Sequence, residues 1–288
     1  MKLLTSSCKL LAAAGFASAV GFAADFAEYG AGADDPAYWD EVYRVQGHHG
    51  RRSYEWYGLG YDELRETLQR LLLQPLRETF WGEAAEVLVV GSGDSDLSSE
   101  LAAEVGESGP EPRPRWLVTS LDFSAEVTER MRRRHPELKF LTMDARNLSS
   151  IEDGSFSAVV DKGLSDCLGD QAERRKYFQG LQQTLRVGGR MLVISQRKLE
   201  VASDTSPGDQ KAASEDLLGF EEDDSWGYDV GADGWACVQE RLLGPLFIED
   251  DPTRPPFPQL GTEGTIPYYV LACSRVAETE MTAMRWQR

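Results

Sequence analysis

The sequence predicts an α/β fold in which a doubly wound sheet of seven strands is mostly parallel and has an antiparallel edge strand. Three observations support this prediction. Short apolar runs alternate five times with stretches of helical periodicity, which is typical of a parallel sheet wound with helices. Glycines follow the first run directly, as they do in nucleotide-binding turns. Two further runs near the carboxyl end have no long helix between them, which predicts the antiparallel strand.

The expected strands are short and rich in β-branched and aromatic residues. The run at 87–90 shows no polar alternation, so we expect a strand that is buried on both faces of the sheet. The expected helices have one apolar face each, and Pro75 is expected to end or kink the first of them. The strands cover 87–90, 116–121, 138–143, 156–160, 191–195, 235–242 and 266–273, and the helices cover 61–76, 94–105, 125–134 and 172–186.

The chain divides into five segments. Residues 1–24 combine two lysines with an apolar stretch of small residues, which resembles a signal or transit peptide more than a membrane span. Residues 34–81 form an aromatic cap and a helix, and residues 84–196 form a nucleotide-binding core. Residues 203–224 are an acidic insertion, and residues 225–288 supply the strands that complete the sheet.

Composition limits the classes of function. The chain has 288 residues, of which 41% are hydrophobic, enough for one substantial core. Its net charge is −18, so nucleic acid and anionic membrane are poor partners, whereas a basic protein would be attracted. The same charge is also explained by solubility alone.

The cysteines and the first 24 residues bear on the compartment. The four cysteines lie far apart without a C-x-x-C pair, which indicates neither a metal site nor a disulfide framework and fits a reducing compartment. We therefore expect a cytoplasmic protein, or one delivered to a mitochondrion or plastid by a cleaved N-terminal segment. The oligomeric state stays open.

The glycine turn is the first candidate binding feature. Gly91 and Gly93 follow the first strand and let the backbone approach a ligand closely. A dinucleotide fingerprint would need a third glycine where Asp96 stands. Asp94 and Asp96 would repel a pyrophosphate at the start of the following helix. A cationic ligand without phosphates, such as S-adenosylmethionine, fits this turn better.

Acidic residues follow the next strands of the predicted sheet. Asp122 ends the second strand, where a carboxylate can accept both hydroxyls of a ribose. Asp144 and Ala145 follow the third, where the carboxylate either accepts a hydrogen bond from an adenine amino group or caps a loop. Asp161 and Lys162 end the fourth strand at the edge where chemistry takes place in this architecture. Lys162 could equally be a surface residue.

Aromatic residues are dense between positions 38 and 57. Composition alone favours a cap that packs its rings on the core. The alternative is that some rings line a cofactor pocket and contact a cation. The residues concerned are Tyr38, Trp39, Tyr43, Tyr54, Trp56 and Tyr57.

With these residues in view, the chain resembles the class I, seven-strand S-adenosylmethionine-dependent methyltransferases. More narrowly, it is similar to the eukaryotic elongation factor 1A lysine methyltransferases and their methyltransferase-like relatives, which include a mitochondrial citrate synthase lysine methyltransferase. The resemblance spans about residues 38–194. It is carried by Tyr38-Trp39-Asp40 with Tyr43, Tyr54-Glu55-Trp56-Tyr57, Val89-Val90-Gly91-Ser92-Gly93-Asp94-Ser95 with Leu97-Ser98, Asp122-Phe123-Ser124, Met143-Asp144-Ala145, and Asp161-Lys162-Gly163 with Asp166.

The resemblance implies a Rossmann-like fold, S-adenosylmethionine as cofactor, and in-line methyl transfer to a lysine of a protein, possibly elongation factor 1A. It favours the reading of the rings as a lid over the cofactor. Asp161 and Asp166 are expected to orient the acceptor amine electrostatically. With Gly93 of the turn, the implied cofactor contacts are Trp39, Tyr43, Trp56, Gly91, Asp122, Phe123, Asp144, Ala145 and Lys162.

The chain also departs from the family pattern. Asp94 stands where the family usually has asparagine, and Leu164 with Ser165 replaces threonine and leucine beside the substrate channel, which leaves the acceptor open. Three alternatives follow: a small-molecule methyltransferase of the same fold, a catalytically silent protein that binds the cofactor or a partner, and an NAD-dependent oxidoreductase. The missing third glycine disfavours the last.

Overall fold

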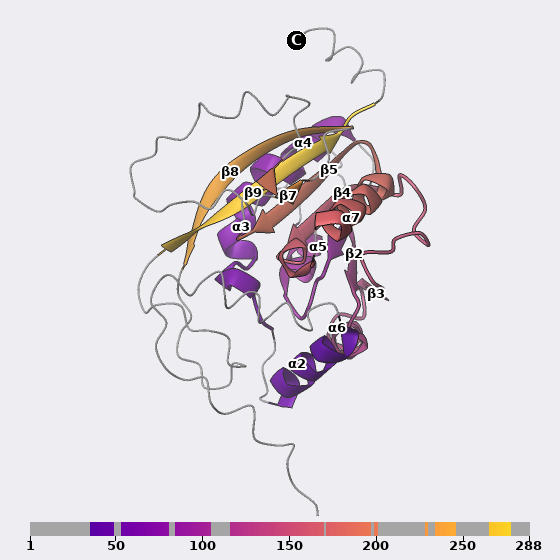
Figure 1. The fold of residues 1–288 in the computed structure, drawn as a ribbon, viewed down its shortest axis with the longest axis vertical. Coiled ribbons are helices and arrows are strands. Elements are labelled where there is room, and N and C mark those ends of the chain that lie inside the picture. The colour runs from indigo at the N-terminus through magenta and orange to yellow at the C-terminus, as the bar shows by residue number, and fades with distance from the viewer. Residues whose placement is uncertain are drawn as a thin grey trace, which may run out of the picture.

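A seven-stranded sheet forms the centre of the molecule (Figure 1). The computed structural model describes residues 35–48, 53–80, 84–104, 116–169, 171–196, 199–200, 228–229, 234–245 and 265–277. The segments expected at 1–24 and 203–224 lie outside these residues. The strand order is β3-β2-β1-β4-β5-β9-β8. The bounds are β1 Ala85–Val90, β2 Trp116–Asp122, β3 Lys139–Thr142, β4 Phe156–Lys162, β5 Leu185–Ser195, β8 Trp235–Pro245 and β9 Thr265–Arg275.

The prediction of a mostly parallel, doubly wound sheet is confirmed. Strands β1 to β5 pair in parallel, and β9 runs antiparallel to both of its neighbours, β5 and the edge strand β8. The direction in which successive strands are added to the sheet reverses between β1 and β4. In open α/β sheets ligands bind outside the carboxyl ends of the strands at such a reversal. A short parallel pair, β6 Leu199–Glu200 and β7 Tyr228–Asp229, forms a second sheet.

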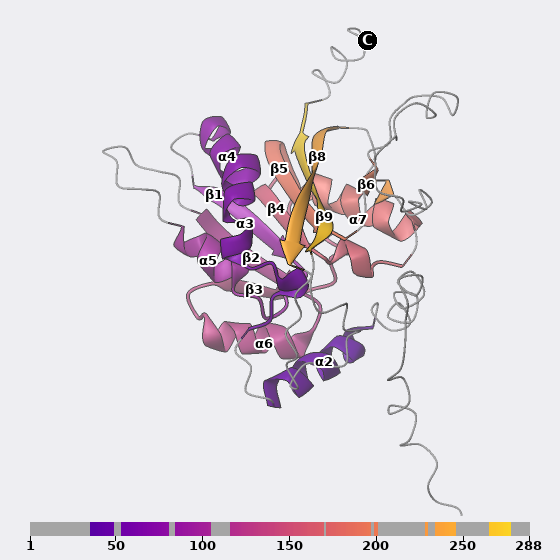
Figure 2. The ribbon, with the colours of Figure 1, turned by 90° about the vertical axis from the view of Figure 1, so that its left-hand side faces the viewer.

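Helices cover both faces of the sheet. Figure 2 shows α3, α4 and α5 on one side, α7 on the other, and α2 beside α6. The α-helices are α2 Pro36–His48, α3 Tyr61–Leu68, α4 Gln74–Thr79, α5 Leu97–Ala103, α6 Ala125–Arg134 and α7 Gln171–Thr184. Two 3₁₀ turns are η2 Trp56–Gly58 and η4 Ser165–Cys167, and η3 Gln69–Leu73 is a π-helix.

The apolar run of β1 lies between two halves of the core. Val87 and Val89 pack in the cluster that contains the leucines of α3, η3 and α5. Leu88 and Val90 pack in the cluster that contains the inner face of α7. All four side chains are at most 3% exposed. Because both faces of the strand are covered, the run needs no polar alternation.

The first helical stretch does not end at Pro75, which was one of the two effects expected of this proline. Helical backbone continues from Tyr61 to Thr79, and its geometry changes near the proline, because the π-helix η3 ends at Leu73, two residues before it. Pro75 has no N–H to offer the carbonyl of Leu71, four residues earlier. Arg190 of β5 supplies the missing donor, with its Nη1 3.3 Å from that oxygen.

The boundaries of α5 and α7 also differ from the prediction. α5 begins at Leu97 instead of residue 94, and the N–H of Asp96 donates to the carboxylate of Glu55. α7 ends at Thr184 instead of residue 186, because Leu185 already pairs with Phe156 as the first residue of β5. Both ends are set by partners distant in the sequence.

The cysteine pattern is the clearest correction. Cys237 and Cys273 form a disulfide, although the sequence indicated none. The antiparallel register of β8 and β9 places the two residues directly opposite each other, with Cα atoms 4.0 Å apart. They lie 36 residues apart in the chain, so no local spacing could reveal the pair.

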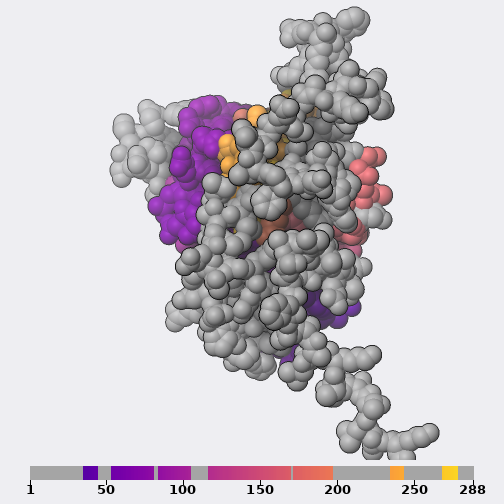
Figure 3. All heavy atoms as spheres, turned by 60° about the vertical axis from the view of Figure 1, so that its left-hand side comes forward, coloured from indigo at the N-terminus to yellow at the C-terminus, as the bar shows by residue number. Residues whose placement is uncertain are grey.

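The edge strand β8 also contacts the helical layer. In the space-filling view of Figure 3, orange atoms of β8 lie beside the purple surface of the preceding helices. Arg70 of η3 and Glu240 of β8 form an ion pair, with Nη1 and Oε2 3.0 Å apart. No helix in the described part of the chain has the length and apolar character needed to cross a membrane.

The core assignment predicts a large effect of truncating a central side chain. Leu88→Ala should lower the free energy of unfolding by about 2–5 kcal/mol, because a fully buried side chain leaves a cavity. Val238→Ala, a matched change on the edge strand at a side chain that is 59% exposed, should change it by less than about 0.5 kcal/mol. Urea unfolding of both variants provides the measurement, and equal losses would contradict the assignment.

Candidate active site

The glycine turn has the geometry that its sequence requires. Gly91 and Gly93 have φ values of 57° and 53°, a conformation that favours glycine. A Cβ at Gly91 would lie 2.8 Å from the Cβ of Leu164, and one at Gly93 would lie 2.7 Å from the hydroxyl of Tyr43. Both positions therefore require glycine for conformational and for spatial reasons.

Asp122 ties this turn to the start of α6. Its carboxylate accepts hydrogen bonds from the N–H of Gly93 at 2.9 Å and from the N–H of Ser124 at 3.0 Å. Ser124 is the N-cap of α6, and its Oγ accepts from the N–H of Val127. Burial raises the pKa of Asp122 to about 6, although the two N–H donors favour its ionised form. Its neighbour Phe123 is half-buried at the same corner.

The three aromatic residues of the predicted lid lie together. Trp39 of α2 is 6.0 Å from Tyr43 and 5.6 Å from Trp56 of η2, measured between ring centroids. A hydrogen bond joins the Tyr43 hydroxyl to the Trp56 side chain. Because this hydroxyl also approaches Gly93, the aromatic cluster lies directly against the glycine turn.

Polar contacts fasten α2 to α6. The Asp40 carboxylate accepts from Ser124 Oγ at 2.5 Å and from the N–H of Glu126 at 3.1 Å. The Arg130 guanidinium donates to the carbonyl of Tyr43. α2 thus adds a second cap to the N-terminus of α6. This contact positions Trp39 and Tyr43 of α2 against the glycine turn.

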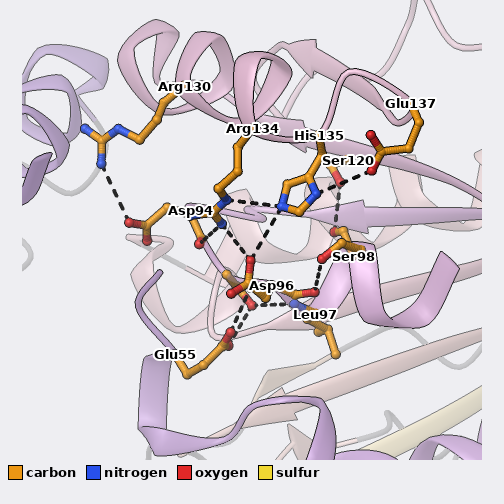
Figure 4. A network of polar contacts seen from close by, with 12 residues as sticks. Glu55, Asp94, Asp96, Leu97, Ser98, Ser120, Arg130, Arg134, His135 and Glu137 are labelled. Carbon is orange, nitrogen blue, oxygen red and sulfur yellow. Dashed lines mark hydrogen bonds and ion pairs between the residues drawn. The ribbon is translucent and has the colours of Figure 1, made fainter. Parts of the chain in front are cut away.

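Lys162 is buried, which excludes the alternative that it is a surface residue. Its Nζ contacts the carboxylate of Glu55 and donates to the carbonyl of Leu59 at 2.8 Å. The same carboxylate accepts from Ser95 Oγ at 2.6 Å and from the N–H of Asp96 at 2.9 Å. Figure 4 shows Glu55 beside Asp96 at the start of α5. Burial lowers the pKa of Lys162, and Glu55 counteracts this effect.

Asp161 lies beneath the loop that follows β4. Its carboxylate accepts from the N–H of Leu164 at 2.8 Å, the N–H of Ser165 at 3.1 Å and the hydroxyl of Tyr177 at 2.9 Å. Burial raises its pKa to about 7, and the nearby charge of Asp166 adds to the effect. Asp161 therefore supports the conformation of the segment that contains Leu164 and Ser165.

Asp166 joins three segments at the carboxyl ends of β4 and β5. Its carboxylate accepts from the hydroxyls of Tyr57 and Ser195 and from the N–H of Gln196, the last at 2.9 Å. The residue is 6% exposed, whereas Tyr57 is half-buried. The hydroxyl of Tyr57 thus meets the buried carboxylate, while part of the Tyr57 residue remains exposed.

Asp144 and Ala145 lie after β3, as the sequence predicted. Ala145 packs in the α7 half of the core. Asp144 pairs with Arg146, whose Nη2 is 2.7 Å from Oδ2, and Arg146 also contacts Glu173 at 3.0 Å. Partial burial would raise the pKa of Asp144, but the hydrogen bonds and charge of Arg146 lower it. Sequence reasoning missed Arg146, although its place two residues after Asp144 allows this pairing.

Asp94 and Ser92 have buried polar atoms without a hydrogen-bond partner. They are 1% and 7% exposed, and neither carboxylate oxygen of Asp94 nor Oγ of Ser92 makes a hydrogen bond within the described residues. The nearest cation is Arg130, whose Nη1 is 3.7 Å from Asp94 Oδ2 (Figure 4). Unsatisfied acceptors beside the turn fit a ligand that carries donors and positive charge, which describes the amino acid part of S-adenosylmethionine.

A separate cleft of about 610 Å³ lies between α2 and α6. It is lined by charged side chains of the two helices and by Thr142, not by the glycine turn. Several of these charges already form ion pairs, including Arg44 with Glu41 and Arg133 with Glu129. We place the site at the turn, because the unsatisfied groups lie there.

Part of the chain is similar to a known family. Residues 87–189 match a family described as a methyltransferase domain. The matched segment contains the strands from β1 to β5, whose order and parallel pairing agree with the fold that the sequence predicted. This match begins in β1 and ends in β5, so the matched segment contains the glycine turn, Asp122 and the loop after β4. A search of curated proteins finds no match.

Several solved structures are similar to this chain. An S-adenosylmethionine-dependent methyltransferase from Methanosarcina mazei is 17% identical, with 72% of this chain and 100% of that chain covered and a TM-score of 0.44. The YcgJ protein from Bacillus subtilis is 12% identical, with 75% and 99% covered and a TM-score of 0.46. A protein studied for the conversion of a disulfide bond into a thioacetal group during echinomycin biosynthesis is 18% identical, with 74% and 85% covered and a TM-score of 0.45.

The buried charge of Asp94 predicts a pH-dependent stability. Burial raises its pKa from 3.8 to about 6, so between these values the folded protein holds a proton that the unfolded chain has lost. The contribution to stability is present below about pH 4 and is lost as the pH rises through about 6. The free energy of unfolding of Asp94→Asn, relative to wild type, should therefore increase by roughly 3 kcal/mol from pH 4 to pH 7. Urea unfolding at each pH tests this; a difference independent of pH would contradict it.

Proposed function

We propose that the chain is a protein-lysine N-methyltransferase that uses S-adenosylmethionine, with elongation factor 1A as the first acceptor to test. The observation that carries this proposal is the buried Asp166 carboxylate at the carboxyl ends of β4 and β5. It lies at the edge where the glycine turn ends β1, because Val90 pairs with Asp161. An anionic group near a site for a cationic cofactor attracts a second cation, and the lysine ammonium is the commonest one on protein surfaces.

The residues of the turn and the lid would hold the cofactor. Asp122 would bind the ribose, since each of its oxygens accepts one backbone N–H and retains acceptor capacity. Phe123, Asp144 and Ala145 would flank the adenine. Lys162 would act through Glu55 by fixing the loop that carries Trp56.

When bound, S-adenosylmethionine supplies a methyl group attached to a positively charged sulfur. The faces of Trp39, Tyr43 and Trp56 suit such a cation and exclude water from it. Asp94 adds negative charge beside the same turn. These side chains favour a sulfonium cofactor over its neutral product.

On the acceptor side, position matters more than acid–base chemistry. Holding the nitrogen of the amine in line with the methyl group lowers the barrier by on the order of 7 kcal/mol. Asp166 would attract and orient the lysine, and Asp161 would act through the loop that it supports. The proton of the incoming ammonium passes to solvent before transfer.

The overall charge suits a basic protein acceptor. A net charge of −18 accelerates association with a lysine-bearing partner. Salt screens this attraction, so the acceleration decreases as the salt concentration increases.

The proposal is tested with S-adenosylmethionine labelled in its methyl group and a panel of lysine-bearing proteins, elongation factor 1A first. Label in lysine, identified by mass spectrometry, supports the proposal. Label only in metabolites would reassign the acceptor to small molecules.

The role of Asp122 gives a quantitative prediction. Asp122→Ala should weaken binding of S-adenosylmethionine by at least about tenfold, because charge-assisted hydrogen bonds to the ribose are lost. Asp153→Ala, a matched change at an exposed turn, should leave the affinity unchanged. Calorimetric titration measures both, and equal affinities of the two variants would refute the assignment of Asp122.

A further inference from the structure

Tyr57 has an unusual backbone conformation at the centre of the site. Among the described residues it is the only one other than glycine with a positive φ, 66°. Bulky side chains rarely adopt this conformation, and it persists only where surrounding contacts enforce it. The Tyr57 carbonyl accepts from the hydroxyl of Tyr268 at 3.2 Å, and the two rings lie 5.1 Å apart.

The hydroxyl of Tyr57 has a defined orientation. It donates to Asp166, which is itself held by Ser195 and Gln196. A hydroxyl has one hydrogen to donate and two lone pairs that accept. With its hydrogen committed to Asp166, the oxygen can only accept from a ligand. The phenol stays protonated, because burial and the charge of Asp166 raise the pKa of Tyr57 well above its usual value.

Tyr57 also lies beside the Gly163 corner, which adjoins the glycine turn. A Cβ at Gly163 would be 2.7 Å from the Tyr57 hydroxyl, and one at Gly91 would be 2.8 Å from Leu164, the residue after Gly163. Since Val90 pairs with Asp161, the turn and the Gly163 corner leave the sheet at the same level. The phenol oxygen therefore contacts the buried carboxylate of Asp166 and the Gly163 corner, and the next residue of that corner, Leu164, contacts the turn.

We propose that the Tyr57 hydroxyl binds the acceptor nitrogen by accepting one of its N–H bonds, and that it thereby limits the number of methyl groups added. This inference rests on the proposed function. A neutral primary amine has two N–H bonds, a monomethylated amine has one and a dimethylated amine has none. In each transfer the nitrogen lone pair forms the N–C bond as the S–C bond of the donor breaks, and the proton then released passes to solvent. Tyr57 can orient the first two transfers but not a third.

Tyr57→Phe keeps the ring and removes only the hydroxyl. We expect affinity for S-adenosylmethionine within twofold of wild type. The rates of the first two methyl transfers should decrease by about tenfold, the effect of losing one neutral hydrogen bond. The rate of a third transfer, where it occurs, should be unchanged. Tyr61→Phe is the matched control, because Tyr61 is a buried tyrosine whose hydroxyl contacts another carboxylate, Glu104. It should leave all three rates unchanged.

A binding measurement makes the test independent of turnover. The whole chain, labelled with ¹³C at the ζ carbon of tyrosine and saturated with S-adenosylhomocysteine, is titrated with n-butylamine while the Tyr57 signal is followed by NMR. That signal is identified by its loss in Tyr57→Phe. We expect a saturable shift of the Tyr57 signal with n-butylamine and none with N,N,N-trimethylbutylammonium, which has no N–H.

The outcomes separate this inference from the proposed function. If the Tyr57 signal does not shift with n-butylamine, or shifts equally with n-butylamine and N,N,N-trimethylbutylammonium, the role of Tyr57 is overturned even if lysine methylation is observed. A selective shift without label in any lysine of the protein panel would keep Tyr57 as an amine site and remove the protein-lysine function. A uniform slowing of all three transfers in Tyr57→Phe would assign the hydroxyl a structural role only.

Discussion

The carboxylate of Glu55 is the contact on which the site depends. It accepts from the N–H of Asp96 and from Ser95 Oγ, and it pairs with the buried Lys162. One side chain thus joins the loop that carries Trp56, the start of α5 and the end of β4. Removing one partner of a buried ion pair leaves an uncompensated charge. The side chain also takes the helix N-terminus at which a dinucleotide would place its pyrophosphate, so the same contact that builds the site selects against phosphate.

The order of strands brings the two halves of the site together. The reversal between β1 and β4 places the glycine turn beside the loop that carries Leu164 and Asp166. Insertion of β9 between β5 and β8 places Tyr269 opposite Ser195 and brings Tyr268 against Tyr57. The C-terminal strands therefore support the part of the site that contains Tyr57, while the match to a methyltransferase domain ends at residue 189, within β5.

Much of the fold could be predicted from local pattern, because the strand runs and the glycine turn carry their own signals. Contacts between distant segments could not. The disulfide of Cys237 and Cys273 depends on strand register, and the passage of a helix through Pro75 depends on a donor from Arg190. The residues around the turn were found by position and resemblance. The orientation of Asp161 beneath its loop and the fixed hydroxyl of Tyr57 arise from partners that no local spacing reveals.

The central claim is that an acidic glycine turn, closed by Glu55 and an aromatic lid, accepts a sulfonium cofactor and rejects a dinucleotide. Calorimetric titration of the whole chain with S-adenosylmethionine, S-adenosylhomocysteine and NAD tests it most directly. The account predicts saturable binding of the first two compounds, tighter for the cationic S-adenosylmethionine, and none of NAD. Binding of NAD, or failure of the folded protein to bind either methyl-cycle compound, would contradict it.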